Sequence, residues 1–465
     1  MNLPERYKER MTALLGDDAK AYFASLEKEP QRHLRINRTK LTGSLPEAEG
    51  VTVTPTDIPD VYVFDGTAGG RNPLHHAGAY YIQELSAMLP VLSAPIEEGW
   101  TVLDLCAAPG GKTGQLASAV GEDGFVVTNE YSSKRSRVLL GNVERLGFRN
   151  CAVYNSSPDK LCPAFAGKFD LVLVDAPCSG EGMFRREPDA VQDWSEENTE
   201  GCAIRQLEIM RSASLAVKPG GYLLYSTCTF SPCEDEELLA RFIGENPRFS
   251  LVPVTPPEGV ELVCGIPADG CETHLCRRAY PHKINGEGQF FGLLRRDDSP
   301  VISAAQDKKD KKPKKGSRPA DDGIRELTKA EKTAAESFLK EFMTDYDTLP
   351  LCVLGGDIFI CKRKDLPADG LLSCGVRLGN IAKDGRLLPH HQFFSSYGST
   401  AKIKLDLDAD SPLLLKYLHG EGFPAEDCGI TENGWGVISV SGCTVGGFRI
   451  AGGYLKNHYP KGLRN

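Results

Sequence analysis

The sequence predicts an α/β fold: a doubly wound, mostly parallel sheet, with a small N-terminal module before it and two small α+β modules after it. Strand-like apolar runs alternate with helical spacing between residues 78 and 298, which is typical of a parallel sheet covered by helices. The chain has 465 residues, more than one hydrophobic core accommodates, so further domains are expected on either side of this sheet.

The stretch TVLDLCAAPGGKT, residues 101–113, is expected to form a strand, a glycine turn and the start of a helix. Gly110 and Gly111 let a ligand approach the backbone, where free N–H groups face it. A phosphate loop would need a glycine in place of Cys106, and the GxGxxG pattern is absent. The next expected strand ends at Glu130, whose carboxylate can accept both hydroxyls of a ribose. The turn therefore predicts a nucleoside site.

Two more apolar runs are expected to be buried strands of the same sheet. FDLVLVDAPC spans residues 169–178, and GYLLYSTCT spans residues 221–229. The carboxyl ends of parallel strands share one edge of a sheet, so the side chains that follow them should face one crevice. The side chains expected there are Asp104, Asp175, Cys178 and Cys228.

Spacing also predicts the remaining elements in order. Apolar residues recur with a helical period between residues 11 and 26 and alternate as in strands between 51 and 63. A helical spacing returns at 77–92. The other expected helices are 133–146, 196–217, 233–246 and 330–343, and the other expected strands are 125–129, 152–154, a run ending at 296, 351–354, 358–361, 401–407 and 436–441.

Three sequence blocks resemble those of a known family. CAAPGGKT, DAPCSGEGMFRR and STCTFSPCEDE, in this order and spacing, are similar to motifs of the NOL1/NOP2/Sun RNA 5-methylcytosine methyltransferases, and within them to the bacterial RsmF type. The resemblance covers most of the chain. It implies a class I S-adenosylmethionine-dependent methyltransferase fold, S-adenosylmethionine as the cofactor and a PUA-like last domain.

The resemblance also implies roles for the residues at the crevice. Carbon 5 of cytosine becomes nucleophilic once a thiolate adds to carbon 6, and a second acid–base group helps the thiol to leave. By resemblance Cys228 is the nucleophile and Cys178 assists release, with Asp175 and Lys112 completing the catalytic set. Spacing alone leaves the order of the cysteines open, because DNA cytosine methyltransferases place the nucleophile in their Pro-Cys motif.

The same resemblance assigns the cofactor site to the glycine turn and its neighbours. The family commonly has an aspartate for the adenine amino group near position 157, where this chain has Ser157. The expected cofactor-binding residues are Cys106, Ala107, Ala108, Pro109, Gly110, Gly111, Lys112, Glu130, Arg135, Ser157 and Asp175.

We expect an N-terminal RNA-binding module at 1–77, the methyltransferase domain at 78–298, a basic flexible linker at 299–323, an intermediate module at 324–389 and the PUA-like RNA-binding domain at 390–465. Basic residues in these modules suit RNA phosphate, although solvated surface charge or local salt bridges are the alternative for each. The candidates are Arg35, Arg38, Arg185, Arg186, Lys456, His458 and Lys461.

Composition narrows the function classes. No apolar run approaches the ~18 residues that span a bilayer, the N-terminus is charged without a signal-peptide core, and the fifteen cysteines include no CxxC pair. We therefore expect a cytoplasmic monomer without metal or membrane contact. A net charge of −9 restricts RNA binding to local basic patches. The main expectation is methylation of small-subunit ribosomal RNA, free or in a 30S-type particle; the alternatives are tRNA methylation and a non-catalytic RNA-binding assembly factor.

Overall fold

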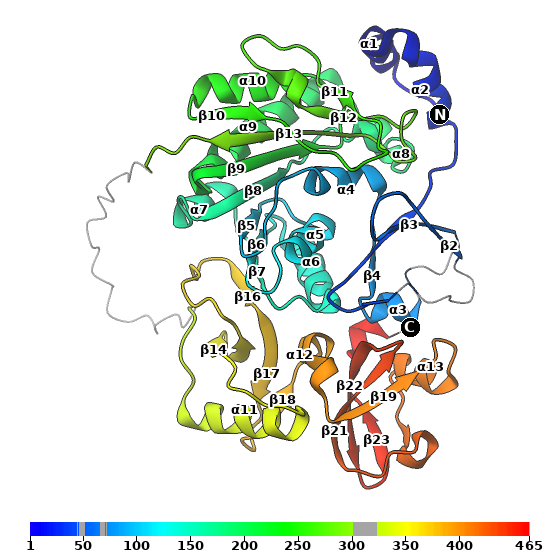
Figure 1. Cartoon of the computed structure of the whole chain (residues 1–465), viewed down its shortest axis with the longest axis vertical. Helices are drawn as coiled ribbons and strands as arrows, with labels where there is room; N and C mark the ends of the chain where they lie inside the picture. Colours follow the sequence, from blue (N-terminus) through cyan, green and yellow to red (C-terminus); the bar gives the residue numbers. More distant parts are fainter. Residues whose placement is uncertain (44, 46–51, 66–69, 71, 301–322, 465) are drawn as a thin grey trace.

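The computed structural model describes residues 1–43, 45, 52–65, 70, 72–300 and 323–464. Its described strands form four sheets. Figure 1 shows the central sheet with its helices in the upper and middle parts of the molecule, and the two C-terminal units side by side below it. The predicted linker at 299–323 lies almost entirely outside the described residues.

Five parallel strands form the centre of the large sheet, and their order reverses at β5 (Thr101–Asp104). A reversal of this kind opens a crevice outside the carboxyl ends of the strands. The predicted doubly wound fold is confirmed. In spatial order the parallel strands are β7 (Cys151–Tyr154), β6 (Phe125–Asn129), β5, β8 (Phe169–Asp175) and β9 (Val217–Thr227).

Antiparallel strands extend this sheet at both edges. β13 (Gln289–Arg296) pairs with β9, and β10 (Phe249–Val252) and β12 (Arg277–Ala279) pair with β13. β11 (Val263–Cys264) pairs with β12 at the outer edge. At the other edge β16 (Leu371–Cys374), from the predicted intermediate module, pairs with β7. The central sheet is therefore built from both sides of the linker.

Helices cover both faces of the sheet, since its central strands are buried on both sides. One apolar cluster joins α7, α9 and α10 to residues such as Val172 and Leu223, and a second joins α4, α5 and α6 to residues such as Val102 and Val126. The helices are α4 (Leu85–Leu92), α5 (Gly111–Ala119), α6 (Ser133–Leu146), α7 (Pro158–Ala164), α8 (Pro188–Asp193), α9 (Glu196–Ala216) and α10 (Glu236–Glu245).

The single helix predicted at 77–92 is wrong. Residues Tyr80–Ile82 form strand β4, which pairs with β1, and α4 begins only at Leu85. Gly78 has φ 73°, and a Cβ there would lie 2.2 Å from the carbonyl oxygen of Arg145, so the chain turns before β4. Glu84 then caps α4 by accepting a hydrogen bond from Ala87 N at 3.0 Å.

The N-terminal segment contributes a helical hairpin and a small antiparallel sheet. Helices α1 (Glu5–Leu15) and α2 (Ala19–Leu26) lie beside α8 and the loops after β8 and β9 (Figure 1). The sheet has the order β2-β3-β1-β4, and the short α3 (Pro73–His76) precedes β4. Its first three strands in chain order are β1 (His33–Ile36), β2 (Thr52–Pro55) and β3 (Val61–Asp65).

The intermediate unit contains α11 (Lys329–Phe342) and a four-stranded antiparallel sheet. Its helix begins at a capping box in which Thr328 and Glu331 exchange hydrogen bonds with each other's backbone. α12 (His391–Tyr397) follows and packs against α6. The strands are β14 (Leu351–Leu354), β15 (Asp357–Ile360), β17 (Val376–Ile381) and β18 (Leu387–Pro389).

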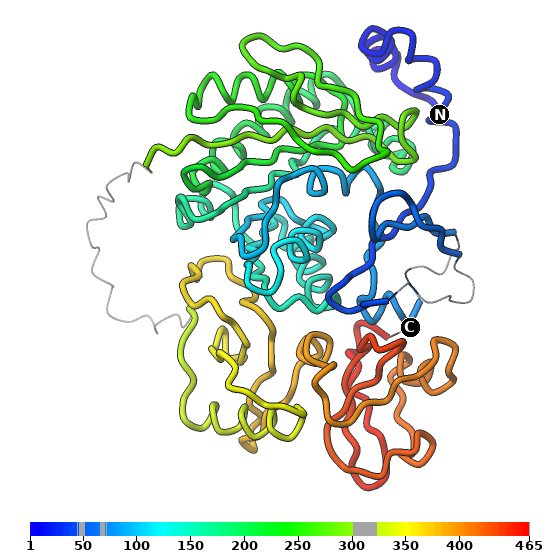
Figure 2. Tube along the Cα trace, in the orientation of Figure 1, coloured from blue at the N-terminus to red at the C-terminus, as the bar shows by residue number. Residues whose placement is uncertain are grey.

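The last unit is a five-stranded sheet that packs on the N-terminal sheet. A shared apolar core contains Leu34 and Tyr80 from one side and Tyr417 and Val445 from the other. Figure 2 shows the red C-terminal segment against the blue N-terminal one. Within the described residues no helix is long and apolar enough to cross a bilayer. The elements are β19 (Ile403–Leu407), α13 (Pro412–Leu418), β20 (Phe423–Pro424), β21 (Gly434–Val440), β22 (Cys443–Ala451) and β23 (Tyr454–Asn457).

Candidate active site

Two thiols meet at the carboxyl edge of the central sheet. Cys178 lies in the loop after β8 and Cys228 directly after β9, and their sulfur atoms are 3.4 Å apart. Both residues are half-buried, so each keeps a solvent-accessible side. The hydrogen bond to Cys228, together with burial, raises the pKa of Cys178 well above its ordinary value. The Cys178 thiol is therefore harder to ionise than an ordinary cysteine.

Backbone contacts hold the two cysteine loops together. Gly182 N donates to the carbonyl oxygen of Cys228 at 2.8 Å, and Gly288 N donates to Gly182 O at 3.1 Å. A Cβ at Gly182 would lie 2.6 Å from the Cα of Gly288 and 2.9 Å from the Cys228 oxygen, so only glycine fits. The loop before β13 thus supports both cysteine loops.

Buried carboxylates strengthen the same junction. Glu234 accepts hydrogen bonds from Ser179 N at 3.0 Å, from Ser179 Oγ at 2.5 Å and from Gln206 Nε2 at 2.8 Å. Burial raises the pKa of Glu234, and these donors oppose that rise. Because Ser179 follows Cys178 in the chain, Glu234 ties the first cysteine loop to the segment that follows the second.

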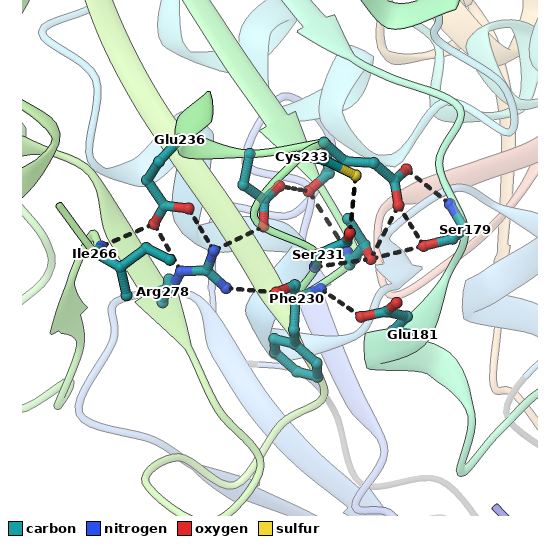
Figure 3. Close-up of polar contacts among 12 residues, drawn as sticks. Ser179, Glu181, Phe230, Ser231, Cys233, Glu236, Ile266 and Arg278 are labelled. Atoms are coloured by element: carbon teal, nitrogen blue, oxygen red, sulfur yellow. Dashed lines mark hydrogen bonds and ion pairs between the residues drawn. The ribbon is translucent and has the colours of Figure 1, made fainter. Parts of the chain in front are cut away.

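A fully buried arginine neutralises the neighbouring acidic residues (Figure 3). Arg278 donates from Nε to Glu236 at 2.7 Å and from Nη1 to the carbonyl of Phe230 at 3.1 Å, and lies 3.2 Å from Asp235. Ile266 N also donates to Glu236, at 3.0 Å. Burial acts to lower the pKa of Arg278, but Tyr280 and these carboxylates raise it overall. The guanidinium nitrogens of Arg278 and both carboxylate oxygens of Glu236 all have hydrogen-bond partners, as a buried charge pair requires.

A lysine–carboxylate pair lies beside the cysteines. Lys112, at the start of α5, is 2.8 Å from Asp175 at the end of β8, and Ser226 Oγ donates to the other oxygen of Asp175 at 2.7 Å. The Lys112 side chain is 9% exposed, whereas that of Asp175 is 33% exposed. Asp175 is therefore held in one orientation by Lys112 and Ser226 and stays partly exposed.

The turn after β5 opens onto the crevice. Gly110 has φ 112°, and a Cβ at Gly111 would lie 3.0 Å from the amide carbon of Gln83. Asp104 accepts from Thr113 Oγ1 at 2.7 Å, while its other oxygen is buried and has no partner among the described residues. Glu130 follows β6 and is 4% exposed. The first turn of α5 thus offers backbone N–H donors, and Asp104 and Glu130 offer carboxylate oxygens, to a polar ligand.

Comparisons with known proteins agree with this geometry. Family models match residues 91–295 (16S rRNA methyltransferase RsmB/F), 3–85 (N-terminal domain of 16S rRNA methyltransferase RsmF) and 404–465 (methyltransferase RsmF PUA domain). A ribosomal RNA small subunit methyltransferase F from Shewanella loihica is 30% identical over 463 residues, which cover 92% of this chain and 88% of that protein. The chain belongs to the RsmB/F family of methyltransferases.

Another relative and a solved structure match parts of the chain. The Erwinia tasmaniensis ribosomal RNA small subunit methyltransferase F is 36% identical over 309 residues, 63% of this chain and 63% of that protein. A methyltransferase homolog protein from Pyrococcus horikoshii has the same fold, with a TM-score of 0.52 at 24% identity over 63% of this chain and 95% of that one.

As an RsmB/F methyltransferase the chain uses S-adenosylmethionine as its methyl donor, and the crevice fits this cofactor. The unpartnered oxygen of Asp104 suits a cationic group, and the turn at Gly111 has no room for a side chain. Glu130 accepts from Ser132 N at 2.8 Å and lies 3.3 Å from Arg135, whose Nη2 donates to Ala108 O at 2.7 Å. The expected cofactor residues Cys106, Gly110 and Glu130 all lie at the carboxyl ends of the neighbouring strands β5 and β6, and their contact with the cofactor remains a prediction.

Three arginines that were predicted to contact RNA instead make contacts within this RsmB/F protein. Arg35 is 8% exposed, with Nη2 donating to Gly111 O at 3.5 Å, so the expectation of an exposed RNA contact is wrong for it. The prediction of an RNA contact is also wrong for Arg185. Its side chain is 8% exposed and pairs with Glu287 at 3.1 Å. Arg186, 25% exposed, also pairs with Glu287, at 2.8 Å.

The remaining candidates stay predictions. The Arg38 side chain is 41% exposed and pairs with Asp60. Lys456, His458 and Lys461 are exposed at the C-terminal end. Ser157 is half-buried before α7, near the end of β7.

Sequence reasoning missed the supporting residues of this RsmB/F site. Glu181 and Glu234 lie inside the matched blocks, and Glu287 lies outside them, but none had been given a role. The available signal was the density of acidic residues beside the cysteines, as in the run CEDE at 233–236. Charged residues so near a buried strand end imply partners, yet the identity of those partners depends on the folded chain.

Proposed function

We propose that the chain transfers a methyl group from S-adenosylmethionine to carbon 5 of a cytosine in 16S ribosomal RNA. One observation carries the proposal: two thiols lie 3.4 Å apart beside the Lys112–Asp175 pair, at the edge that also holds the cofactor turn. Cytosine methylation at carbon 5 needs one thiolate and one further acid–base group. The cytosine must leave its stack to enter this crevice.

In the proposed reaction the sulfur of Cys228 forms a bond to carbon 6 of the ring, which makes carbon 5 nucleophilic. S-adenosylmethionine supplies the methyl group as an electrophile. Once Cys228 is bonded to carbon 6, Cys178 releases its S–H proton to solvent, and the thiolate so formed takes the proton from carbon 5. The electron pair of that C–H bond then expels the Cys228 thiolate. Asp175 accepts a hydrogen bond from the cytosine amino group or holds the proton of the ring nitrogen. Lys112 keeps Asp175 oriented and balances its charge.

The order of the cysteines is supported by their environments. Cys178 is held by Ser179 and Glu234, and its pKa is raised by the contact with Cys228 and by burial. A Cys178 that stays protonated donates its S–H toward the Cys228 sulfur, which stabilises a thiolate at Cys228. This favours addition by Cys228 and proton handling by Cys178.

The substrate proposal rests on relatives and on domain content. The Shewanella loihica relative is named for the small ribosomal subunit, and its alignment covers 88% of that protein. The last domain matches the model of the RsmF PUA domain. Methylation of tRNA by the same chemistry is the alternative. A non-catalytic assembly factor would not need Cys178 and Cys228 in contact.

Substitution of each cysteine tests the chemistry and the order together. We expect Cys228→Ala to transfer no methyl group, because no thiolate remains to activate carbon 5. Cys178→Ala should transfer the methyl group and then stall with RNA attached, giving a slow, RNase-sensitive band on a denaturing gel. Cys264→Ala, at an exposed cysteine far along the chain, is the matched control.

The opposite pattern, an adduct with Cys228→Ala and none with Cys178→Ala, would reverse the two roles. Full activity in both variants would exclude thiolate catalysis. Bisulfite sequencing of 16S ribosomal RNA and tRNA from a deletion strain would identify the substrate; loss of 5-methylcytosine from tRNA alone would contradict the ribosomal assignment.

A further inference from the structure

Glu181, three residues after Cys178, joins the two cysteine loops from a fully buried position. Its side chain is 0% exposed. One oxygen accepts from Trp194 Nε1 at 2.7 Å and from Arg10 Nη2 at 2.5 Å. The other accepts from the backbone N of Phe230, in the loop after β9, at 3.2 Å (Figure 3). A carboxylate so placed holds the loops only while its charge is compensated.

Arg10 of α1 supplies that compensation and contacts both loops. Within the described residues it is the only cation within salt-bridge distance of Glu181. Its Nη1 also lies 3.4 Å from Ser231 Oγ. Glu181 is the third residue after Cys178, and Ser231 is the third residue after Cys228. One guanidinium therefore contacts the two loops at matching positions.

The position of Arg10 is itself fixed by packing. Its guanidinium carbon lies 5.5 Å from the ring centroids of both Tyr7 and Trp194. The Tyr7 ring lies 5.0 Å from that of Phe184, and Met11 is fully buried in the same cluster. Helix α1 is thus seated on the segment that follows Cys178, and it has little freedom to carry Arg10 away.

The backbone passes any shift of Glu181 on to the second cysteine. The next residue, Gly182, donates to the carbonyl oxygen of Cys228 at 2.8 Å. No side chain fits at Gly182, so the contact is a direct approach of two main chains. Movement of Glu181 would therefore alter the position of Cys228 relative to Cys178.

From these contacts we infer that Arg10 is a positioning residue of the cysteine site: the N-terminal module, through Arg10, Glu181 and Ser231, sets the 3.4 Å separation of the two sulfurs. The inference deepens the proposed function and rests on its thiolate chemistry. Arg10 touches neither substrate nor cofactor residues, and it acts through Glu181 and Ser231. The N-terminal helices are then part of the catalytic apparatus as well as of the RNA-binding module.

The test compares Arg10→Ala and Arg10→Lys with Arg6→Ala. Arg6 lies on the same helix, its side chain is 74% exposed, and its ion pair is with Glu9 at 3.6 Å. Alkylation of Cys228 by iodoacetamide is followed against pH by mass spectrometry of the full chain, without RNA. In Arg10→Ala the midpoint should rise by about 1 pH unit, because Cys228 loses the S–H donor that stabilises its thiolate. Arg10→Lys should fall between wild type and Arg10→Ala.

Steady-state kinetics give the second measurement. We expect kcat for methyl transfer to fall about 10- to 100-fold in Arg10→Ala with KM for RNA unchanged, since the reacting groups are misplaced but the RNA contacts remain. Cofactor affinity by calorimetry should not change, because the crevice residues lie at β5 and β6. Arg6→Ala should match wild type in every measurement.

A double variant separates the loss of positioning from a loss of folding stability. Arg10→Met with Glu181→Gln removes the buried unpaired charge, so it should recover the melting temperature lost in Arg10→Met but not the alkylation profile. An unchanged profile and kcat in folded Arg10→Ala would overturn the inference, as would a rise in KM alone, which marks a docking residue. If the wild type methylates no RNA, the proposed function fails, while the alkylation result still decides the role of Arg10.

Discussion

Asp104 is a buried carboxylate with one oxygen unused. Thr113 Oγ1 donates to one oxygen at 2.7 Å, and the other has no partner within the described part of the chain. Burial raises the pKa of Asp104 to about 7, and the hydrogen bond from Thr113 opposes this rise only in part. The free protein therefore changes charge at this site near neutral pH.

This titration predicts a pH-dependent cofactor affinity. S-adenosylmethionine carries a sulfonium and an ammonium group, which attract the ionised form of Asp104. Since the carboxyl is mostly protonated at a pH of about 6 and mostly ionised at about 8, the dissociation constant should fall about tenfold over that range. Calorimetry measures it directly.

Asp104→Asn should bind more weakly and lose this pH dependence. Asp123→Asn, at a side chain that is 96% exposed, is the control and should keep it. A pH profile that persists in Asp104→Asn would assign the titration to another group.

The place of a single residue could be predicted from sequence where it depended on the neighbouring strand alone. Asp175, Cys178 and Cys228 follow buried strands, and the parallel sheet brings them to one edge, as expected. Arg185 was not predictable, because its partner Glu287 lies 102 residues away in the chain. A basic residue has the same appearance in sequence whether it faces phosphate or a buried carboxylate.

Elements were predictable where their period was clear. The helices near 133–146 and 196–217 are found as α6 and α9. The prediction of one helix over 77–92 was wrong because aromatic and apolar residues run through both β4 and α4. Their apparent helical spacing hid the turn at Gly78. The antiparallel pairing of β16 with β7 was not foreseeable, since nothing local in residues 371–374 specifies a partner more than 200 positions earlier.

At the C-terminal end a cleft of about 900 Å³ lies between α11 and the last sheet. Trp435 forms part of its wall, with the His458 ring 4.6 Å and the Arg449 guanidinium 5.5 Å from the indole. Lys456 is exposed beside them on β23. Cations interleaved with aromatic rings suit phosphate contact and base stacking.

Arg449→Ala and Lys456→Ala should therefore weaken RNA binding with little effect on cofactor binding. Each removed phosphate contact is expected to reduce the slope of log K against log salt by about 1. Fluorescence anisotropy with labelled RNA over a salt series measures the slope. Lys416→Ala, an exposed lysine on α13 outside the cleft lining, should leave it unchanged. Equal slopes for wild type and both variants would exclude these two side chains as phosphate contacts.

The units of the molecule share cores and sheets, so they are not separate modules joined only by linkers. The last sheet shares an apolar core with the N-terminal sheet, and β16 from the intermediate unit extends the central sheet. His76 and Tyr459 are joined by a 2.9 Å hydrogen bond across the same interface. Deleting the C-terminal domain would expose this core, so the loss of RNA contacts would not be separated from loss of folding.

Lys40 lies where three parts of the chain meet. Its Nζ donates to Ala77 O at 2.7 Å, to Arg145 O at 3.1 Å and to Ser395 Oγ at 2.6 Å. These acceptors belong to the N-terminal sheet's connection, to α6 of the central domain and to α12, which precedes the last sheet. A single lysine side chain, whose pKa burial lowers to about 7, thus links the N-terminal and C-terminal units to the central domain.

Lys40→Met should uncouple these parts. It removes the donor to Ala77 O and Ser395 Oγ and leaves Arg145 O with only the hydrogen bond from Ser395 Oγ, which lowers the free energy of unfolding by about 1–3 kcal/mol. Because the lost contacts bridge the last domain and the catalytic domain, calorimetry should show the transition broadened or split, with the last domain melting first. Lys20→Met, on the exposed side of α2, is the control. A Lys40→Met protein that melts in one transition at the wild-type temperature would show that apolar packing alone joins the two ends of the molecule.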